Sequence, residues 1–194
     1  MLALTHGMMS LAAAGGGPEL SLDGSTWSGW TVVGGTATIE AGEGSPSAPC
    51  WFAPSGVYGF RALSSFTTGR RISFRVRPRS GSLSLGTFFF GCNSSGNGPF
   101  LRLDARGGDC GIGTATSWGP SIPGPTQAQR GTLSVGIWYV VEIEMTSPTA
   151  GLWRLDGVTV GTFTTTIMGN FIAFSGNADV GITPPFWDTL EAFA

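Results

Sequence analysis

The stretch Arg71-Ile72-Ser73-Phe74-Arg75-Val76-Arg77 alternates strictly between apolar and polar side chains. Successive side chains of a β-strand point to opposite faces, so Ile72, Phe74 and Val76 are expected on one face and the arginines on the other. This pattern predicts an antiparallel strand with one face in a core and the other face in water.

Similar short segments lie on both sides of this stretch. Tyr139 to Met145 alternates in the same way, and Leu152–Leu155 and Val158–Phe163 flank the pair Asp156-Gly157. An Asp-Gly pair between two such runs favours the two-residue type I′ turn of a β-hairpin. Further strands are expected near residues 36–41, 57–63, 82–90, 100–105, 110–116, 132–137, 171–175 and 187–193.

About a dozen short strands with no convincing helix between them predict an all-β fold. We expect two antiparallel sheets packed face to face as a jelly-roll sandwich. The long connections are expected at Gly91–Pro99 and Ser117–Gly131, which are rich in Gly, Pro, Ser and Asn. Loops of this length in a compact domain are either functional or conformationally loose.

The N-terminal segment differs from the rest of the chain. Residues 1–14 have some helical character, and Gly15-Gly16-Gly17-Pro18 ends it. We therefore divide the chain into an apolar arm with a glycine hinge, residues 1–17, and a sandwich, residues 18–194. The segment lacks the basic start of a signal peptide. Its apolar side chains are those of Leu2, Leu4, Met8, Met9 and Leu11.

An isolated helix as short as this arm is only marginally stable in water. We expect the arm to bind protein, either neighbouring copies of this chain or a different subunit. Docking of the arm on its own sandwich is the alternative.

Composition excludes several classes of function. Charged residues make up 11% of the 194 residues and the net charge is −2, which argues against a nucleic-acid partner. All ten basic residues are arginines, and without lysine neither a P-loop nor a Schiff-base enzyme is possible. No apolar run approaches the ~20 residues that span a bilayer, so no membrane association is expected.

The cysteine and histidine content gives no sign of a metal site or a catalytic triad. Cys50, Cys92 and Cys110 have no C-x-x-C spacing and are expected to be buried free thiols, although a Cys92–Cys110 bridge stays open. His6, the only histidine, lies in the arm and is expected at an assembly contact. We expect no cofactor.

The order of motifs in residues 60–194 resembles the concanavalin A-like lectin and glucanase superfamily, which includes laminin G-like domains. The resemblance is carried by the strand at 71–77, by Gly136-Ile137-Trp138-Tyr139-Val140-Val141-Glu142-Ile143, by Leu152-Trp153-Arg154-Leu155-Asp156-Gly157 and by Trp187-Asp188. It implies a concanavalin A-like sandwich, and it supports the fold much more than any function.

The resemblance also allows two functional patterns of the superfamily to be checked. Its glucanases carry E-x-D-x-x-E on one strand, and Glu142-Ile143-Glu144 matches only the beginning because Met-Thr-Ser follows. A retaining hydrolase needs two suitably placed carboxyl groups, so we expect no enzyme. Its lectins bind calcium with clustered Asp and Asn, whereas Asp104, Asp109, Asn93 and Asn97 are scattered, so no metal is expected.

Four arginines, Arg71, Arg75, Arg77 and Arg79, form a basic stripe on one strand face. The stripe is expected to pair with carboxylates of neighbouring strands, with an anionic ligand as the alternative. The candidate carboxylates are Glu142, Glu144, Asp188 and Glu191.

Binding of a sugar needs an aromatic platform and a few oriented polar groups. Trp138, Trp153 and Trp187 fall in predicted strands and are expected to be buried or half-buried. Trp118 lies in a predicted long loop, so we nominate Trp118 with Asn93 and Asn97 as the glycan-binding residues.

Two functional hypotheses remain. The first is a non-enzymatic bacteriophage virion protein, a minor tail or capsid-decorating component that displays a lectin-like sandwich and docks through its arm. The absence of lysine, which suggests a GC-rich genome, the arm and the lectin resemblance motivate it. Its partners would be other virion proteins or copies of itself, and host-surface glycan. The alternative is a carbohydrate-binding module of a secreted or cell-surface protein.

Overall fold

The computed structural model describes residues 17–45, 48–79, 84–117, 124–176 and 183–194. These residues form fifteen strands and no helix. The strands are β1 (Leu20–Leu22), β2 (Thr31–Val33), β3 (Thr38–Glu40), β4 (Cys50–Phe52), β5 (Tyr58–Ala62), β6 (Arg71–Arg77), β7 (Leu85–Cys92), β8 (Asn97–Asp104), β9 (Cys110–Thr116), β10 (Gln127–Arg130), β11 (Tyr139–Ser147), β12 (Ala150–Leu155), β13 (Val158–Thr164), β14 (Phe171–Gly176) and β15 (Phe186–Phe193).

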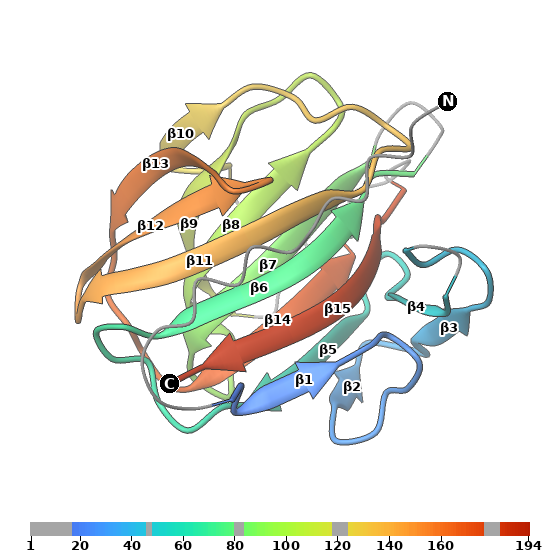
Figure 1. Cartoon of the computed structure of the whole chain (residues 1–194), viewed down its shortest axis with the longest axis horizontal. Coiled ribbons are helices and arrows are strands. Elements are labelled where there is room, and N and C mark those ends of the chain that lie inside the picture. The colour runs from blue at the N-terminus through green and yellow to red at the C-terminus, as the bar shows by residue number, and fades with distance from the viewer. Residues whose placement is uncertain (1–16, 46–47, 80–83, 118–123, 177–182) are drawn as a thin grey trace.

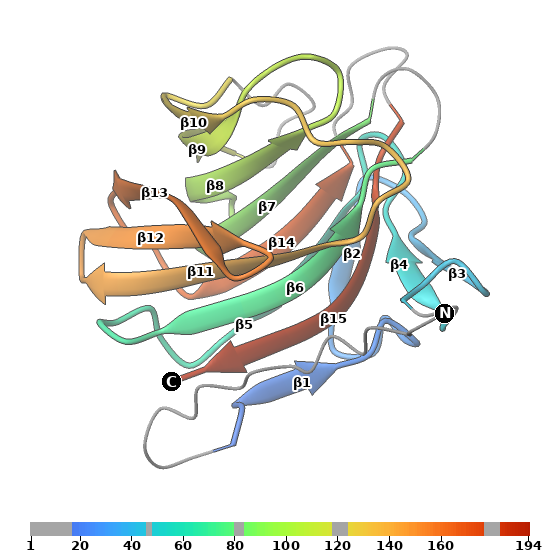
Figure 2. The same cartoon turned by 45° about the horizontal axis from the view of Figure 1, so that its top comes forward.

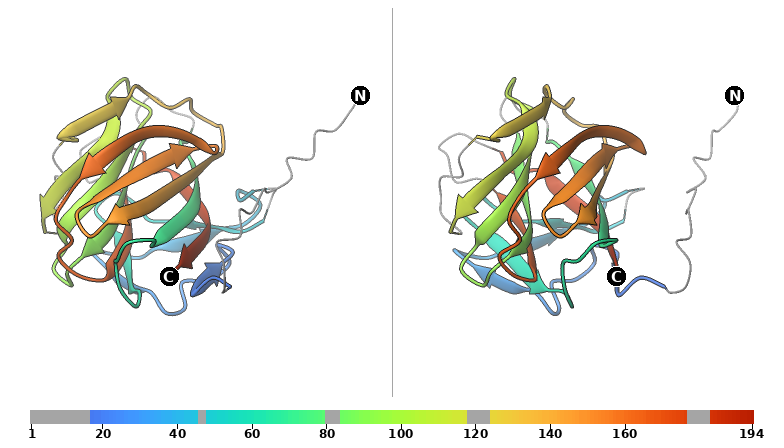
Figure 3. Two further views of the ribbon diagram at one scale, coloured as in Figure 1. Left: turned by 60° about the vertical axis from the view of Figure 1, so that its left-hand side comes forward. Right: turned by 90° about the vertical axis from the view of Figure 1, so that its left-hand side faces the viewer.

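The strands build two antiparallel sheets that pack face to face, as the side views in Figure 3 show. Sheet A has the order β13-β12-β11-β6-β15-β4-β3, with β1 paired to β15 (Figure 1). Sheet B has the order β10-β9-β8-β7-β14-β5-β2. The expected all-β sandwich is therefore confirmed.

The core lies between the inner faces of the two sheets. Ile72, Phe74 and Val76 of β6 are fully buried, while the alternating residues of β6 are half-buried. Phe88 and Phe174 from sheet B contact the Phe74 ring, with ring centroids 4.2 and 5.9 Å apart. The predicted orientation of the 71–77 strand is correct.

The predicted hairpin at Asp156-Gly157 is also confirmed. β12 and β13 pair as far as Leu155 and Val158, with one shift of register between Trp153 and Arg154. Asp156 and Gly157 have φ values of 51° and 79°, and a type I′ turn requires positive φ at both central residues.

Three expectations about strands and loops are wrong. Gly91–Pro99 is not a long loop, because β7 and β8 extend into it and leave only a tight turn between them. In this turn Asn93 Oδ1 accepts hydrogen bonds from the backbone N–H groups of Ser95 and Asn97. Residues 132–137 form no strand. The backbone N–H groups of Leu133 and Gly136 donate to the carbonyl groups of Asp104 and Pro78, and these bonds belong to no pair of strands. The expected loop Ser117–Gly131 contains β10, and within it residues 118–123 lie outside the described residues.

Two glutamines connect the open edges of the two sheets. The side-chain amide of Gln127 in β10 donates to the Thr164 carbonyl at 2.8 Å and accepts from the Thr164 N–H at 3.1 Å. Gln129 donates to the Thr162 carbonyl and accepts from Trp153 Nε1 at 2.5 Å. β13 is therefore partly protected at its free edge by side chains of sheet B.

The basic stripe lies on the outer face of sheet A and stacks mainly on aromatic rings. Arg71 lies over Phe193, and both Arg77 and Arg79 lie over Phe186. Among the described residues, the ion pair of this stripe joins Arg77 to Glu43, and none joins it to the four carboxylates named from the sequence.

The N-terminal part of the described chain is held by a buried arginine. β1 lies beside β15 (Figure 2), and Glu19, directly before β1, forms an ion pair with Arg70, whose side chain is 1% exposed. Arg70 also donates to the carbonyl groups of Ser65 and Phe193. Burial alone would raise the pKa of Glu19, but hydrogen bonds from Arg70 and Ser64 outweigh it and the pKa is lowered.

The apolar arm with its five nominated side chains and His6 lies outside the described residues, so the boundary at residue 17 stays a prediction. In the described part of the chain, no helix is long and apolar enough to cross a membrane.

The variant Glu19→Gln should lower the free energy of unfolding by roughly 1–3 kcal/mol at neutral pH, because it leaves a buried guanidinium without its charged partner. A carboxylate with a lowered folded-state pKa stabilises the fold above its ordinary pKa and loses this effect as pH falls. The difference between the two proteins should therefore shrink below the ordinary Glu value of 4.5. Urea unfolding at several pH values measures it.

Glu43→Gln is the matched control, because Glu43 is 48% exposed in its ion pair with Arg77. Exposed pairs contribute about 0.2–1 kcal/mol. If both variants have the same small effect at neutral pH, the Glu19–Arg70 pair does not anchor β1.

Candidate functional site

The central strand β7 of sheet B is buried on both of its faces. All eight residues of β7 are buried, although in an antiparallel sandwich the outer face is commonly solvated. Phe88 and Phe90 belong to the core between the sheets, while Phe89 belongs to a second cluster with Tyr58 and Phe100. Because alternate residues point to opposite faces, the second cluster lies on the outer face of sheet B.

One row of this outer face is aromatic. The register aligns Phe60 with Ala173, Ala173 with Phe89, and Phe89 with Phe100 across four strands. Phe171 on β14 adds a ring 5.7 Å from Phe60 in an edge-on arrangement. We call Phe60, Phe89, Phe100 and Phe171 the aromatic row.

The next row along the same strands is polar. The register aligns Tyr58 with Ser175, Ser175 with Thr87, and Thr87 with Arg102. Burial raises the pKa of Tyr58. We call Tyr58, Ser175, Thr87 and Arg102 the polar row. Neighbouring strands lie about 4.8 Å apart, so the row extends for about 14 Å across the sheet.

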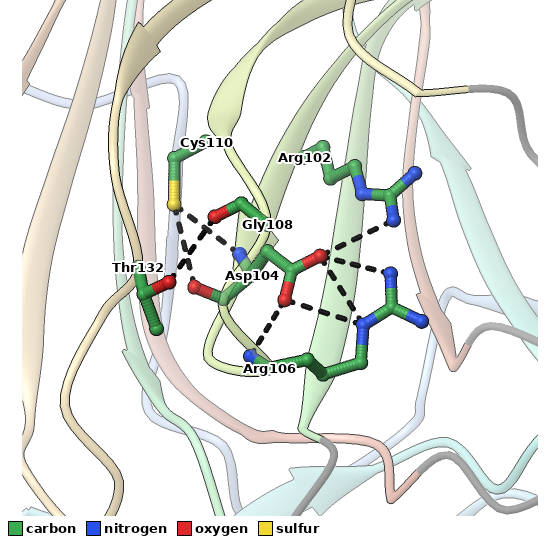
Figure 4. A network of polar contacts seen from close by, with 6 residues as sticks. All are labelled: Arg102, Asp104, Arg106, Gly108, Cys110 and Thr132. Carbon is green, nitrogen blue, oxygen red and sulfur yellow. Dashed lines mark hydrogen bonds and ion pairs between the residues drawn. The ribbon is translucent and has the colours of Figure 1, made fainter.

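At one end of the polar row, Arg102 binds the buried carboxylate of Asp104 (Figure 4). Asp104, which is 1% exposed, accepts a hydrogen bond from Arg102 at 3.2 Å and one from Arg106 at 2.8 Å. Burial would raise the pKa of Asp104, but the hydrogen bonds and charges of the two arginines lower it overall. Asp104 therefore stays ionised and orients the Arg102 guanidinium.

Exposure differs along this face. Phe60, Phe171 and Arg102 are half-buried and reachable from solvent, whereas Thr87, Phe89 and Ser175 are fully buried. All fifteen described strands belong to the two sheets, so the described residues contain no third sheet that covers this face. Rings beside hydroxyl groups suit a ligand with an apolar face and polar edges.

Of the nominated glycan-binding residues, Asn93 and Asn97 lie together in the β7–β8 turn, outside the two rows. Asn93 uses its side-chain oxygen within the β7–β8 turn, and Asn97 lies in phase with Leu101, which belongs to the core between the sheets. Trp118 lies outside the described residues. Trp138, Trp153 and Trp187 are buried or half-buried, as expected.

Sequence reasoning missed both rows. Leu85 to Phe90 is almost continuously apolar, and such a run does not reveal which residues face the core. Thr87 is the residue that could have indicated the polar row, because it places a hydroxyl within an otherwise apolar segment.

The carboxylates Glu142 and Glu144 lie on β11 at the outer face of sheet A, away from both rows. Glu144 is held in an ion pair with Arg154 at 2.8 Å. Among the described residues, no group of three or more His, Cys, Asp or Glu side chains could hold a metal ion.

The three cysteines are free and buried. Cys92 belongs to the outer cluster of sheet B and Cys110 to the core between the sheets, so the two thiols lie on opposite faces. Burial raises the pKa of Cys50 to about 12 and that of Cys110 to about 11. Thiols with such values are poor nucleophiles.

No protein-family model matches the chain, and no curated protein matches it. Solved structures are similar in fold. The carbohydrate-binding module CBM66 from Bacillus subtilis has a TM-score of 0.60 at 15% identity, over 84% of this chain and 95% of that one. The galectin LEC-6 from Caenorhabditis elegans has a TM-score of 0.52 at 12% identity, over 70% and 89%.

A carbohydrate esterase from the Shiga toxin-encoding bacteriophage phi24B has a TM-score of 0.57 at 14% identity, over 90% of this chain and 97% of that one. Identities this low show the fold alone. The chain has the jelly-roll, lectin-like sandwich that is found in galectins and carbohydrate-binding modules.

Proposed function

We propose that this chain is a non-enzymatic glycan-binding module whose site is the outer face of sheet B. The observation that carries the proposal is the aromatic row lying beside the polar row on neighbouring positions of the same strands. Its likeness in fold to a carbohydrate-binding module and to a galectin supports it.

The two rows match the two kinds of surface on a sugar. The apolar C–H face of a pyranose ring can pack on Phe60 and Phe171, which are half-buried and form a pair at one end of the face. Its hydroxyl groups need donors and acceptors at fixed positions, and the polar row carries such groups on neighbouring strands, with Arg102 reachable from solvent.

The finer part of the proposal is location. We propose that the module is displayed on a bacteriophage virion, as a minor tail or capsid-decorating component that attaches to host-surface glycan. The likeness to a phage carbohydrate esterase and the apolar arm support this. A carbohydrate-binding module of a secreted or cell-surface protein is the alternative, and its support from the fold is equal.

The double variant Phe60→Ala, Phe171→Ala should weaken glycan binding at least tenfold, which corresponds to about 1.4 kcal/mol. It removes the accessible part of the aromatic row. A glycan array followed by calorimetry on the best ligand measures the effect.

Phe193→Ala is the matched control, because Phe193 is an equally half-buried phenyl ring on the outer face of sheet A. It should bind as the parent does. Loss of binding in Phe193→Ala with retention in the double variant would move the site to sheet A.

Absence of enzymatic activity is tested with Glu142→Gln, Glu144→Gln. The two side chains are half-buried on the outer face of sheet A and contribute little, so the double variant should keep glycan affinity and shift the midpoint of unfolding only slightly. Reducing-sugar release from β-glucans should stay at background in both proteins. Turnover by the parent that the double variant loses contradicts the proposal.

Deletion of residues 1–17 should leave a folded monomer with a nearly unchanged midpoint of unfolding, because β1 and the Glu19–Arg70 pair remain. Sedimentation velocity of the full chain should show self-association that the deletion removes. A monomeric full chain means that the arm binds a different subunit. A large loss of stability on deletion means that the arm belongs to the core of its own sandwich.

A further inference from the structure

The Thr87 hydroxyl is buried without a hydrogen-bond partner. Thr87 is 0% exposed, and within the described ranges no group hydrogen-bonds its Oγ1. It lies at the centre of the polar row, between Ser175 on β14 and Arg102 on β8. It therefore occupies the middle of the proposed glycan-binding face.

No described neighbour pairs with the Thr87 hydroxyl. Ser175 Oγ on β14 is likewise buried without a hydrogen-bond partner among the described residues, and Arg102 donates to Asp104 at 3.2 Å. A buried hydroxyl without a partner destabilises a fold, and valine would fill the same volume in a strand without this effect. A threonine at this position is understandable when its hydroxyl finds a partner in another state of the protein.

We propose that the Thr87 hydroxyl hydrogen-bonds a hydroxyl group of a neutral saccharide and is a specificity-determining residue of this face. The inference rests on the proposed function. A threonine hydroxyl both donates and accepts, as a sugar hydroxyl does. The guanidinium of Arg102 is already held by the Asp104 carboxylate, so the row recognises hydroxyl groups in preference to the carboxylate of an acidic sugar.

Access to Thr87 requires a change in the protein, because Thr87, Phe89 and Ser175 are buried in this structure. The saccharide binds a conformation in which this face is open. The measured affinity is then reduced by the fraction of molecules in that conformation.

The experiment compares Thr87→Val with Thr87→Ser. The probes are neutral gluco-, manno- and galacto-oligosaccharides, with uronic-acid oligosaccharides beside them. Thr87→Val should raise the Tm by about 2–4 °C, because it removes the unpaired hydroxyl, and should weaken binding roughly tenfold. Thr87→Ser removes a buried methyl group, so it should lower the Tm, but it keeps the hydroxyl and should retain affinity within about threefold.

Thr165→Val is the matched control. The Thr165 hydroxyl is also buried without a partner among the described residues, but Thr165 lies outside the two rows, after β13. This variant should raise the Tm without changing affinity.

The outcomes separate this inference from the proposed function. Unchanged affinity in Thr87→Val, while Phe60→Ala, Phe171→Ala loses binding, overturns the role of Thr87 alone. Equal losses in Thr87→Val and Thr87→Ser also overturn it, because the hydroxyl would not be the group that matters. If the protein binds the uronic-acid probes and none of the neutral ones, the proposal of a neutral saccharide is wrong. A parent protein that binds no probe overturns the proposed function and this inference with it.

Discussion

Four aromatic rings join the two sheets at the centre of the sandwich. Phe74 and Trp187 come from sheet A, and Phe88 and Phe174 come from sheet B. The centroids of Phe74 and Phe88 are 4.2 Å apart, and those of Phe174 and Trp187 are 4.7 Å apart. Each ring belongs to an inner strand of its sheet, namely β6, β15, β7 or β14. A slip of one residue in any of them would turn its ring away from the core, so the rings determine the register.

The same constraint determines the position of the candidate site. When Phe88 points into the core, Thr87 and Phe89 must point outward, and the same alternation places Ala173 and Ser175 beside them. The two rows are therefore positioned by the packing on the opposite side of the sheet. Sheet A shows the contrast, because its outer face is half-buried and carries arginines stacked on aromatic rings.

The parts of the fold that sequence predicts well have strong local signals. The strand at 71–77 has perfect alternation, and Asp156-Gly157 has the dihedral angles that its turn type requires. The errors fall where a local signal is weak or misleading. Gly91 and Asn93 suggest a loop, yet Gly91 adopts a positive φ of 63° within β7 and the Asn93 side chain closes a tight turn. Three-residue strands such as β2 and β4 are too short to show periodicity, and their pairing partners hold them in place.

The candidate site could not be predicted because it depends on which face of β7 is covered. When a strand is apolar on both faces, its sequence does not show which residues face the core. Packing against the aromatic rings of the other sheet determines which residues face inward. Sequence reasoning favours Asn93, Asn97 and Trp118 because loops commonly carry function. Sheet B carries aromatic side chains on strands whose backbone is packed on the core. Its accessible rings, Phe60 and Phe171, lose little conformational entropy when a ligand binds, which favours recognition of a weakly interacting ligand such as a saccharide.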